Sequence, residues 1–152
     1  MPWRQMTDQE MLALLQRAPV GHLGLSKDGQ PYVVPLHFVY QDGSIYLHSK
    51  RGGCKLAWIQ ANPRVCFEVE EFISIIEAPS ACDYSTECSS VVIQGHARLV
   101  EDEAEKRGVL AGLVQKYAPA VAGQPLSDAD VARTQVVEIV IEEMSGKARS
   151  RQ

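Results

Sequence analysis

The chain has 152 residues, of which 45% are hydrophobic and 22% charged, and this composition is typical of a single globular domain spanning 1–152. Its net charge of −4 at pH 7 repels polyanions on average, so we expect no nucleic-acid partner. No apolar run approaches the ~20 residues that cross a bilayer, and the polar start of the chain carries no signal segment. We therefore expect a cytoplasmic protein without a membrane partner.

The cysteines predict neither disulfides nor a metal site. Four are present, at Cys54, Cys66, Cys82 and Cys88. Without an export signal they should stay reduced. The spacing of Cys82 and Cys88 is not a usual zinc spacing, and neither belongs to a CxxC motif. We expect free thiols and no bound metal.

The first half of the chain alternates turns and strands after one helix. Thr7 and Glu10 form a capping box, which predicts a helix to about Arg17, ended by Pro19. Three β-prone runs follow, separated by two Asp-Gly turns: 20–26, 31–40 and 44–49. These predict an antiparallel three-stranded meander.

The second half adds three more strands and further helices. A short helix is expected at 54–60, closed by Asn62-Pro63, and then a strand at 65–76. The remaining expected segments are an irregular stretch at 77–88, a strand at 89–100, a helix at 101–117, a short helix capped at Ser127, and a strand at 134–142. Six antiparallel strands with peripheral helices predict a mainly β fold, a closed or nearly closed small barrel. Tight hairpins exclude the parallel sheet of a Rossmann fold.

The segment from Leu47 to Lys55 has the composition of a phosphate site. A strand ends in His48 and Ser49, passes two cations and two glycines, and enters a helix that contains Lys55. Glycines let the backbone approach an anion, and a helix N-terminus carries partial positive charge. A solvated basic turn without a ligand has the same composition, so both interpretations stay open at this point.

Several segments together resemble a known family of flavoproteins. They are Val20-Gly21-His22-Leu23-Gly24-Leu25, the run from Pro31 to Tyr40, the run from Ile45 through Lys55-Leu56 to Val69, Ser90-Val91-Val92-Ile93-Gln94-Gly95-His96-Ala97, and Val137-Glu138-Ile139 with Ser145-Gly146-Lys147. In this order they are similar to the pyridoxamine 5′-phosphate oxidase-like family, in particular its nitroimidazole-resistance branch.

The resemblance implies a six-stranded FMN-binding split β-barrel that forms a homodimer, with FMN at the subunit interface. Carried over by position, His48, Ser49 and Lys55 would hold the FMN phosphate. The residues expected at the flavin ring are Val34, Pro35, Leu36, His37 and, from a later strand, Ser90. The chain departs from the family pattern at Cys54, where relatives place an arginine, and Arg51 is the residue expected to compensate.

Other polar residues have structural interpretations. His22 and His96 are expected to be structural or surface residues, and the acids Glu68, Glu70 and Glu71 fit a solvated strand face. His37 is either catalytic or simply hydrogen-bonded on its strand. No catalytic side chain is assigned.

Three functions follow in order of preference. The first is an FMN-dependent oxidoreductase that passes electrons from NAD(P)H to a small acceptor, with nitroaromatics as one class, in which the cofactor performs the redox step. The second is a flavin- or haem-binding module without turnover. The third is a barrel that has lost its cofactor. A pyridoxamine-phosphate oxidase proper is disfavoured, because a second arginine-rich phosphate clamp is lacking in the sequence.

Overall fold

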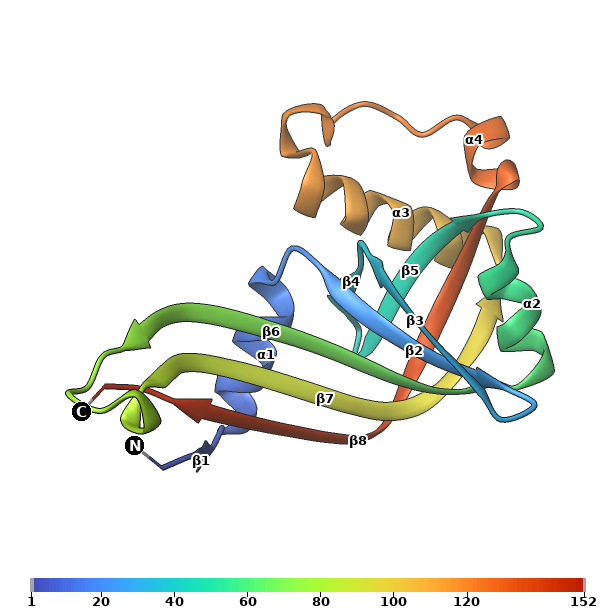
Figure 1. Ribbon diagram of the computed structural model, residues 1–152. Helices are drawn as coiled ribbons and strands as arrows, with labels where there is room; N and C mark the ends of the chain where they lie inside the picture. Colours follow the sequence, from blue (N-terminus) through green and yellow to red (C-terminus); the bar gives the residue numbers. More distant parts are fainter. Residues whose placement is uncertain (1, 152) are drawn as a thin grey trace.

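A computed structural model describes residues 2–151 and has one antiparallel sheet with helices around it (Figure 1). The strands are β1 (Arg4–Gln5), β2 (Gly21–Lys27), β3 (Gln30–Leu36), β4 (Val39–Gln41), β5 (Ser44–Lys50), β6 (Arg64–Ile76), β7 (Ser85–Val100) and β8 (Thr134–Arg149). The α-helices are α1 (Asp8–Arg17), α2 (Cys54–Ala61), α3 (Glu103–Tyr117) and α4 (Asp128–Arg133). Two 3₁₀ turns lie at Ala81–Asp83 and Pro119–Val121.

The mainly β split-barrel fold predicted from the sequence is confirmed, but the strand count of six is wrong within the described residues. The sheet has eight strands in the order β3-β2-β6-β7-β8-β5-β4, with β1 paired to β8. The additional strands are the two-residue β1 and the second piece of the run 31–40.

That run breaks at His37 and Phe38, and the break makes the predicted meander wrong. β3 pairs with β2, whereas β4 pairs with β5 at the opposite end of the strand order. The chain therefore crosses from one sheet edge to the other at these two residues. Local β propensity cannot reveal such a crossing, because both pieces are rich in the same residue types.

The hairpin turns and helix caps predicted from the sequence lie where expected, unlike the predicted strand pairing. Asp28 and Asp42 have φ near +50°, and the glycines after them have φ of +78° and +77°, as tight hairpin turns require. The capping box is complete, because Thr7 Oγ1 accepts from Glu10 N–H and the Glu10 carboxylate accepts from Thr7 N–H at 2.8 Å. Ser127 caps α4 with its side chain alone, because its hydroxyl oxygen accepts from Asp130 N–H at 3.0 Å.

The main core fills the inside of the sheet and is closed by two helices. Inward-facing residues such as Leu23, Phe67 and Ile93 are fully buried. α1 contributes Leu14 and Leu15, and α2 contributes Leu56 and Ile59. Trp58 of α2 is partly buried and packs against this core.

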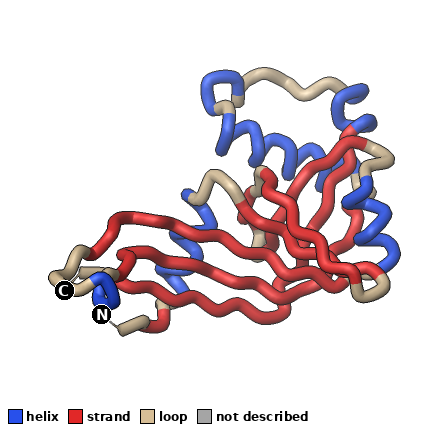
Figure 2. The backbone as a smooth tube through the Cα atoms, in the orientation of Figure 1, coloured by secondary structure: helices blue, strands red, loops and turns tan. Residues whose placement is uncertain are grey.

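A three-stranded arm extends from the barrel toward the two termini (Figures 1 and 2). β6, β7 and β8 form it, because β7 begins at Ser85 and β8 continues to Arg149, further in both cases than the sequence predicted. The stretch 77–88 is therefore irregular only in its first part. The arm exposes Phe72, Ile73 and Ile75, at 64%, 53% and 46% of their surface.

α3 packs on the outer face of the sheet and builds a second, smaller core. Val109 and Leu113 lie against Val39, Tyr46 and Val136. No helix of residues 2–151 is long and apolar enough to span a bilayer. The layer that α3 and α4 add forms one wall of a cleft over β5, and this cleft is the candidate site.

Candidate functional site

The predicted phosphate segment lies where β5 runs into α2. Lys50 is paired with Thr134 and His48 with Val136, so the end of β5 lies beside the junction of α4 and β8. A cavity of about 480 Å³ opens there, lined by His48, Ser49, Lys50, Arg133 and Thr134. It has the volume and the cationic lining for a phosphate group.

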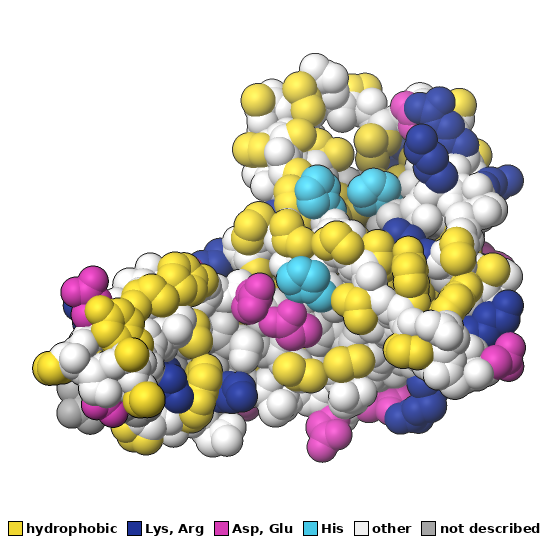
Figure 3. Space-filling model, viewed as in Figure 1, with side chains coloured by type: hydrophobic (Ala, Val, Ile, Leu, Met, Phe, Trp, Pro, Cys, Tyr) yellow, Lys and Arg dark blue, Asp and Glu magenta, His cyan; other side chains and the backbone are white. Residues whose placement is uncertain are grey.

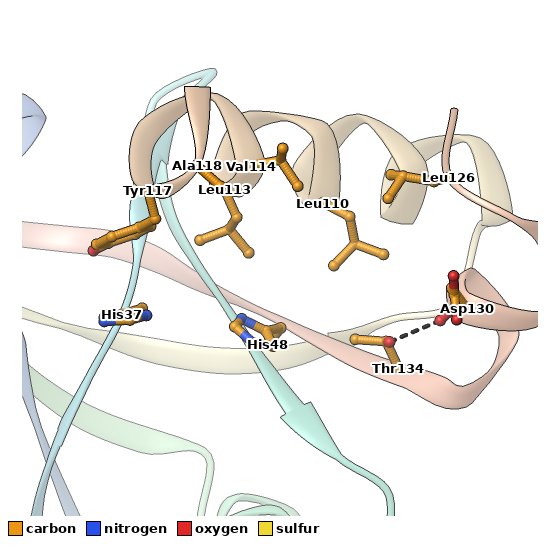
Figure 4. A pocket seen from close by; sticks show the side chains of 10 residues that line it. All are labelled: His37, His48, Leu110, Leu113, Val114, Tyr117, Ala118, Leu126, Asp130 and Thr134. Carbon is orange, nitrogen blue, oxygen red and sulfur yellow. Dashed lines mark hydrogen bonds between the residues drawn. The ribbon is translucent and has the colours of Figure 1, made fainter. Parts of the chain in front are cut away.

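An apolar pocket of about 250 Å³ continues from this cavity beneath α3 (Figure 4). Its roof is made of Leu110, Leu113 and Val114, while His37 and His48 point into it from the strand side. In the space-filling view two histidines lie in a hollow beneath the upper layer, with a group of basic side chains beside them (Figure 3). The site thus has a cationic end and a flat apolar end.

Lys55 is half-buried, whereas Lys50 and Arg133 are exposed. Burial lowers the pKa of His48 below its usual value, and the neighbouring Lys55 and His37 act in the same direction. Burial also lowers the pKa of Lys55. No acidic side chain of the described residues forms an ion pair with either. Partial burial of the unpaired Lys55 ammonium is costly, and a bound anion would relieve that cost.

Tyr117 fixes the orientation of His37. The two rings are stacked with centroids 4.1 Å apart. The Tyr117 hydroxyl accepts from Phe38 N–H at 3.1 Å and donates to the carbonyl of either Pro19 or Phe38, at 3.0 and 3.1 Å. The C-terminal end of α3 is thereby fastened to the break between β3 and β4.

The four residues expected along the flavin ring are divided between two faces. Val34 and Leu36 pack against the barrel core, while Pro35 and His37 are exposed, and only His37 lines the apolar pocket. β3 ends the strand order and pairs only with β2 in the described sheet. Its second edge therefore has backbone groups that a ligand could contact.

Ser90 is not brought to the cleft within one chain. It lies on the arm opposite Lys147, whereas His48 lies opposite Val136. The two levels are separated by roughly 35 Å along β8 at the usual rise of a strand. His37, His48, Ser49 and Lys55 are thus grouped by the fold, and Ser90 is not.

Several lining residues were not predicted from the sequence. Leu110 and Leu113 lie in the helix expected at 101–117, but neither they nor Leu126, Arg133 and Thr134 were assigned to a site. The sequence did contain one hint of these residues: a helix with a broad apolar face, followed by a capped short helix that ends in Arg133. That hint identifies no site until the pairing of β5 with β8 is known.

The other histidines and the cysteines lie elsewhere. His22 lies 3.0 Å from Glu68 and His96 lies 2.6 Å from Glu142, both on the outer face of the sheet, which agrees with structural roles. All four cysteines are free thiols. Within residues 2–151 no group of three or more His, Cys, Asp or Glu side chains is placed to hold a metal ion.

Comparison with known proteins points to one family. Residues 7–148 match the family model described as pyridoxamine 5′-phosphate oxidase. An uncharacterised protein of Rhizobium meliloti is 30% identical over 71 residues, which are 47% of this chain and 46% of that protein. The match therefore spans about half the length of that curated relative.

Three solved structures share the fold over nearly the whole chain. The flavocytochrome Anf3 of Azotobacter vinelandii has a TM-score of 0.86 and 26% identity, covering 98% of this chain and 70% of its own. A protein of Bacteroides thetaiotaomicron assigned to 5-nitroimidazole antibiotic resistance has a TM-score of 0.78 and 26% identity, covering 97% of this chain and 89% of its own. An FAD-binding protein of Mesorhizobium loti has a TM-score of 0.75 and 29% identity, covering 99% of this chain and 100% of its own.

Proposed function

The chain belongs to the pyridoxamine 5′-phosphate oxidase family, and from that premise we propose that it is a flavoprotein oxidoreductase whose cofactor is FMN. The observation that carries the proposal is the cleft itself: Lys50 and Arg133 line a cavity at one end of an apolar pocket, and the half-buried Lys55 lies near His48 without an ion-pair partner among the described residues. FMN has the matching shape, with a phosphate at one end and a flat ring at the other. A bound flavin supplies the redox chemistry between NAD(P)H and a small acceptor, with nitroaromatics as one class.

The residues of this chain would bind and orient that cofactor. Lys55, His48 and Ser49 would hold the phosphate by charge and hydrogen bonds. The apolar roof of Leu110, Leu113 and Val114 would exclude water from the pocket, and His37 would line its floor. No side-chain acid or base is required by such a role, in keeping with the apolar character of the pocket.

The first experiment is the absorbance spectrum of the purified protein, followed by identification of the flavin released on denaturation. FMN in the released fraction and steady oxidation of NADH or NADPH support the oxidoreductase. A flavin spectrum without turnover would reduce the proposal to a binding module. Protein that neither carries nor takes up flavin would refute it.

We further propose that two copies share each site. Ser90 and His48 are too far apart in one chain to contact one flavin, so a role for Ser90 needs a second copy. The exposed apolar side chains of the arm, Phe72, Ile73 and Ile75, are of the kind that protein interfaces cover. Ligand that binds only the associated state also strengthens association by mass action.

Subunit complementation tests this sharing. Lys55→Ala and Ser90→Trp each damage one half of a shared site, so each variant alone should bind little FMN. A dimer that contains one copy of each variant should have one intact site and one doubly damaged site. If mixing restores nothing although mixed dimers form, or if a monomer in the ultracentrifuge retains its flavin, the shared site is wrong.

Haem is the second candidate, and the two imidazoles favour it. His37 and His48 point into one apolar pocket (Figure 4), and histidine is a common axial ligand of haem iron. The flavocytochrome Anf3 has the same fold. Reconstitution with hemin would give a Soret band that His37→Ala or His48→Ala shifts; without such a band the candidate is rejected.

A further inference from the structure

The anion end of the cleft lacks the arginine that relatives place at position 54, and a cation of α4, Arg133, lines the cavity at that end. Cys54 begins α2 as an exposed free thiol. Arg51 was the expected substitute, yet its guanidinium donates to the Ala132 carbonyl at 2.7 Å. Arg51 also lines a different cavity, together with the acids Glu101, Glu103 and Asp128. It fastens the turn to α4 and faces away from the phosphate position.

Arg133 follows Ala132, the residue whose carbonyl accepts from Arg51. It is the last residue of α4 and lines the same cavity as His48, Ser49 and Lys50. Its side chain is 77% exposed and forms an ion pair with Asp130 at 2.5 Å. An exposed pair of this kind contributes little and is easily rearranged, so its guanidinium can turn to an incoming anion at small cost.

The position of α4 is itself well determined. Thr134 pairs with Lys50 across β5 and β8, and the Thr134 hydroxyl donates to the Asp130 carbonyl at 2.8 Å. Together with the Arg51 contact to Ala132, these bonds place the Arg133 backbone beside the end of β5. A guanidinium suits phosphate because its donors form a planar fork.

We propose that Arg133 is the second cation of the cofactor's phosphate cradle, supplied by α4 in place of the arginine missing at position 54. This assignment rests on the proposed binding of FMN. In it, Arg51 is a positioning residue that holds α4, and Arg133 contacts the phosphate.

The test compares FMN with riboflavin, which has the same ring and no phosphate. Arg133→Ala should weaken FMN binding about tenfold, as expected for one exposed charged contact, and leave riboflavin binding unchanged. Arg64→Ala is the matched control, because Arg64 is also exposed (73%) and paired with an acid, Glu142, but lies outside the cleft. Binding is followed by quenching of flavin fluorescence.

A rescue variant makes the test specific. In the Arg133→Ala background, Cys54→Arg should recover most of the lost FMN affinity by restoring a cation to the cradle from the helix side. Unchanged FMN affinity in Arg133→Ala, or an equal loss for riboflavin, would overturn the assignment while leaving the flavin proposal in place. Wild-type protein that binds neither ligand would overturn the flavin proposal, and the assignment with it.

Discussion

On the outer face of the sheet, His22 lies beside Glu68, while His96 and Arg64 share Glu142. In the cleft under α3, His37 stacks on Tyr117, and His48 has Lys55 and His37 as neighbours. The first region contains its own counter-charges, so its polar groups need nothing from outside the chain. In the second region Lys55 is half-buried and has no ion-pair partner among the described residues, and Arg133 has only its exposed pair with Asp130. We interpret this shortage of counter-charge as the mark of a binding site.

The largest effect is expected at Lys55, the cation near His48 in the first turn of α2. Lys55→Ala should lower FMN affinity about ten- to a hundredfold, because it removes a charged contact of roughly 1.5–3 kcal/mol. Fluorescence titration measures the change. Lys27→Ala, on the exposed end of β2, is the control and should bind as wild type does. Equal affinities for both variants would remove Lys55 from the site.

The Tyr117 hydroxyl fastens the end of α3 to the rim of the cleft. Tyr117→Phe removes the hydroxyl shared by Phe38 N–H and the carbonyls of Pro19 and Phe38. Leaving such groups unsatisfied costs about 1–3 kcal/mol, to be measured by urea denaturation. Tyr84→Phe, on an exposed tyrosine, should change nothing. A Tyr117→Phe variant as stable as wild type would show that this hydroxyl does not fasten α3.

Lys116 is a cation beside the cleft whose removal should stabilise the protein. Its Nζ lies 3.7 Å from the Phe38 ring centroid and has no hydrogen-bond partner among residues 2–151. Burial lowers its pKa to about 8. After allowance for solvent screening and the cation–π contact, Lys116→Met should gain about 1 kcal/mol at pH 7.

The sign of the pH dependence identifies the cause. Between the folded pKa of about 8 and the unfolded value of about 10.4, the unfolded chain binds more protons, so wild-type stability rises with pH. The advantage of Lys116→Met should therefore shrink over this range in urea melts at increasing pH. A constant difference between the two proteins would indicate repacking rather than charge burial.

The smallest effect is expected on the outer face of the sheet, where His96 and Arg64 share Glu142. The hydrogen bond from His96, with Arg64 nearby, lowers the pKa of Glu142. This contribution is present above the unfolded pKa of about 4.3 and is lost as pH falls through the folded value. Glu142→Gln should melt slightly below wild type at neutral pH and together with it in acid. A larger loss of stability than for Tyr117→Phe would contradict the division of the molecule into these two regions.

Sequence predicted the features that depend on neighbouring residues. The Asp-Gly turns, the Thr7 and Ser127 caps and the strand-to-helix segment around His48 and Lys55 lie where expected, because each is decided within a few residues. The resemblance to the family supplied the barrel that these pieces build.

The features that were missed depend on pairing across the chain. The break at His37 separates two strands of equal β propensity, and only their partners, β2 and β5, distinguish them. Arg133 enters the cleft because Thr134 pairs with Lys50, 84 positions earlier in the sequence. No local pattern encodes that distance.

The position of β8 in the strand order has a consequence for how the chain acquires its structure. β8 is the last of the strands in residues 2–151, yet it lies between β7 and β5 and joins the two halves of the sheet. Until it emerges from the ribosome, β5 and β7 each present an open edge, and such edges are prone to pair with other chains. We therefore expect the barrel and the end of the cleft where β5 pairs with β8 to close only after β8 has been made, and the open edges of β5 and β7 must avoid pairing with other chains until then.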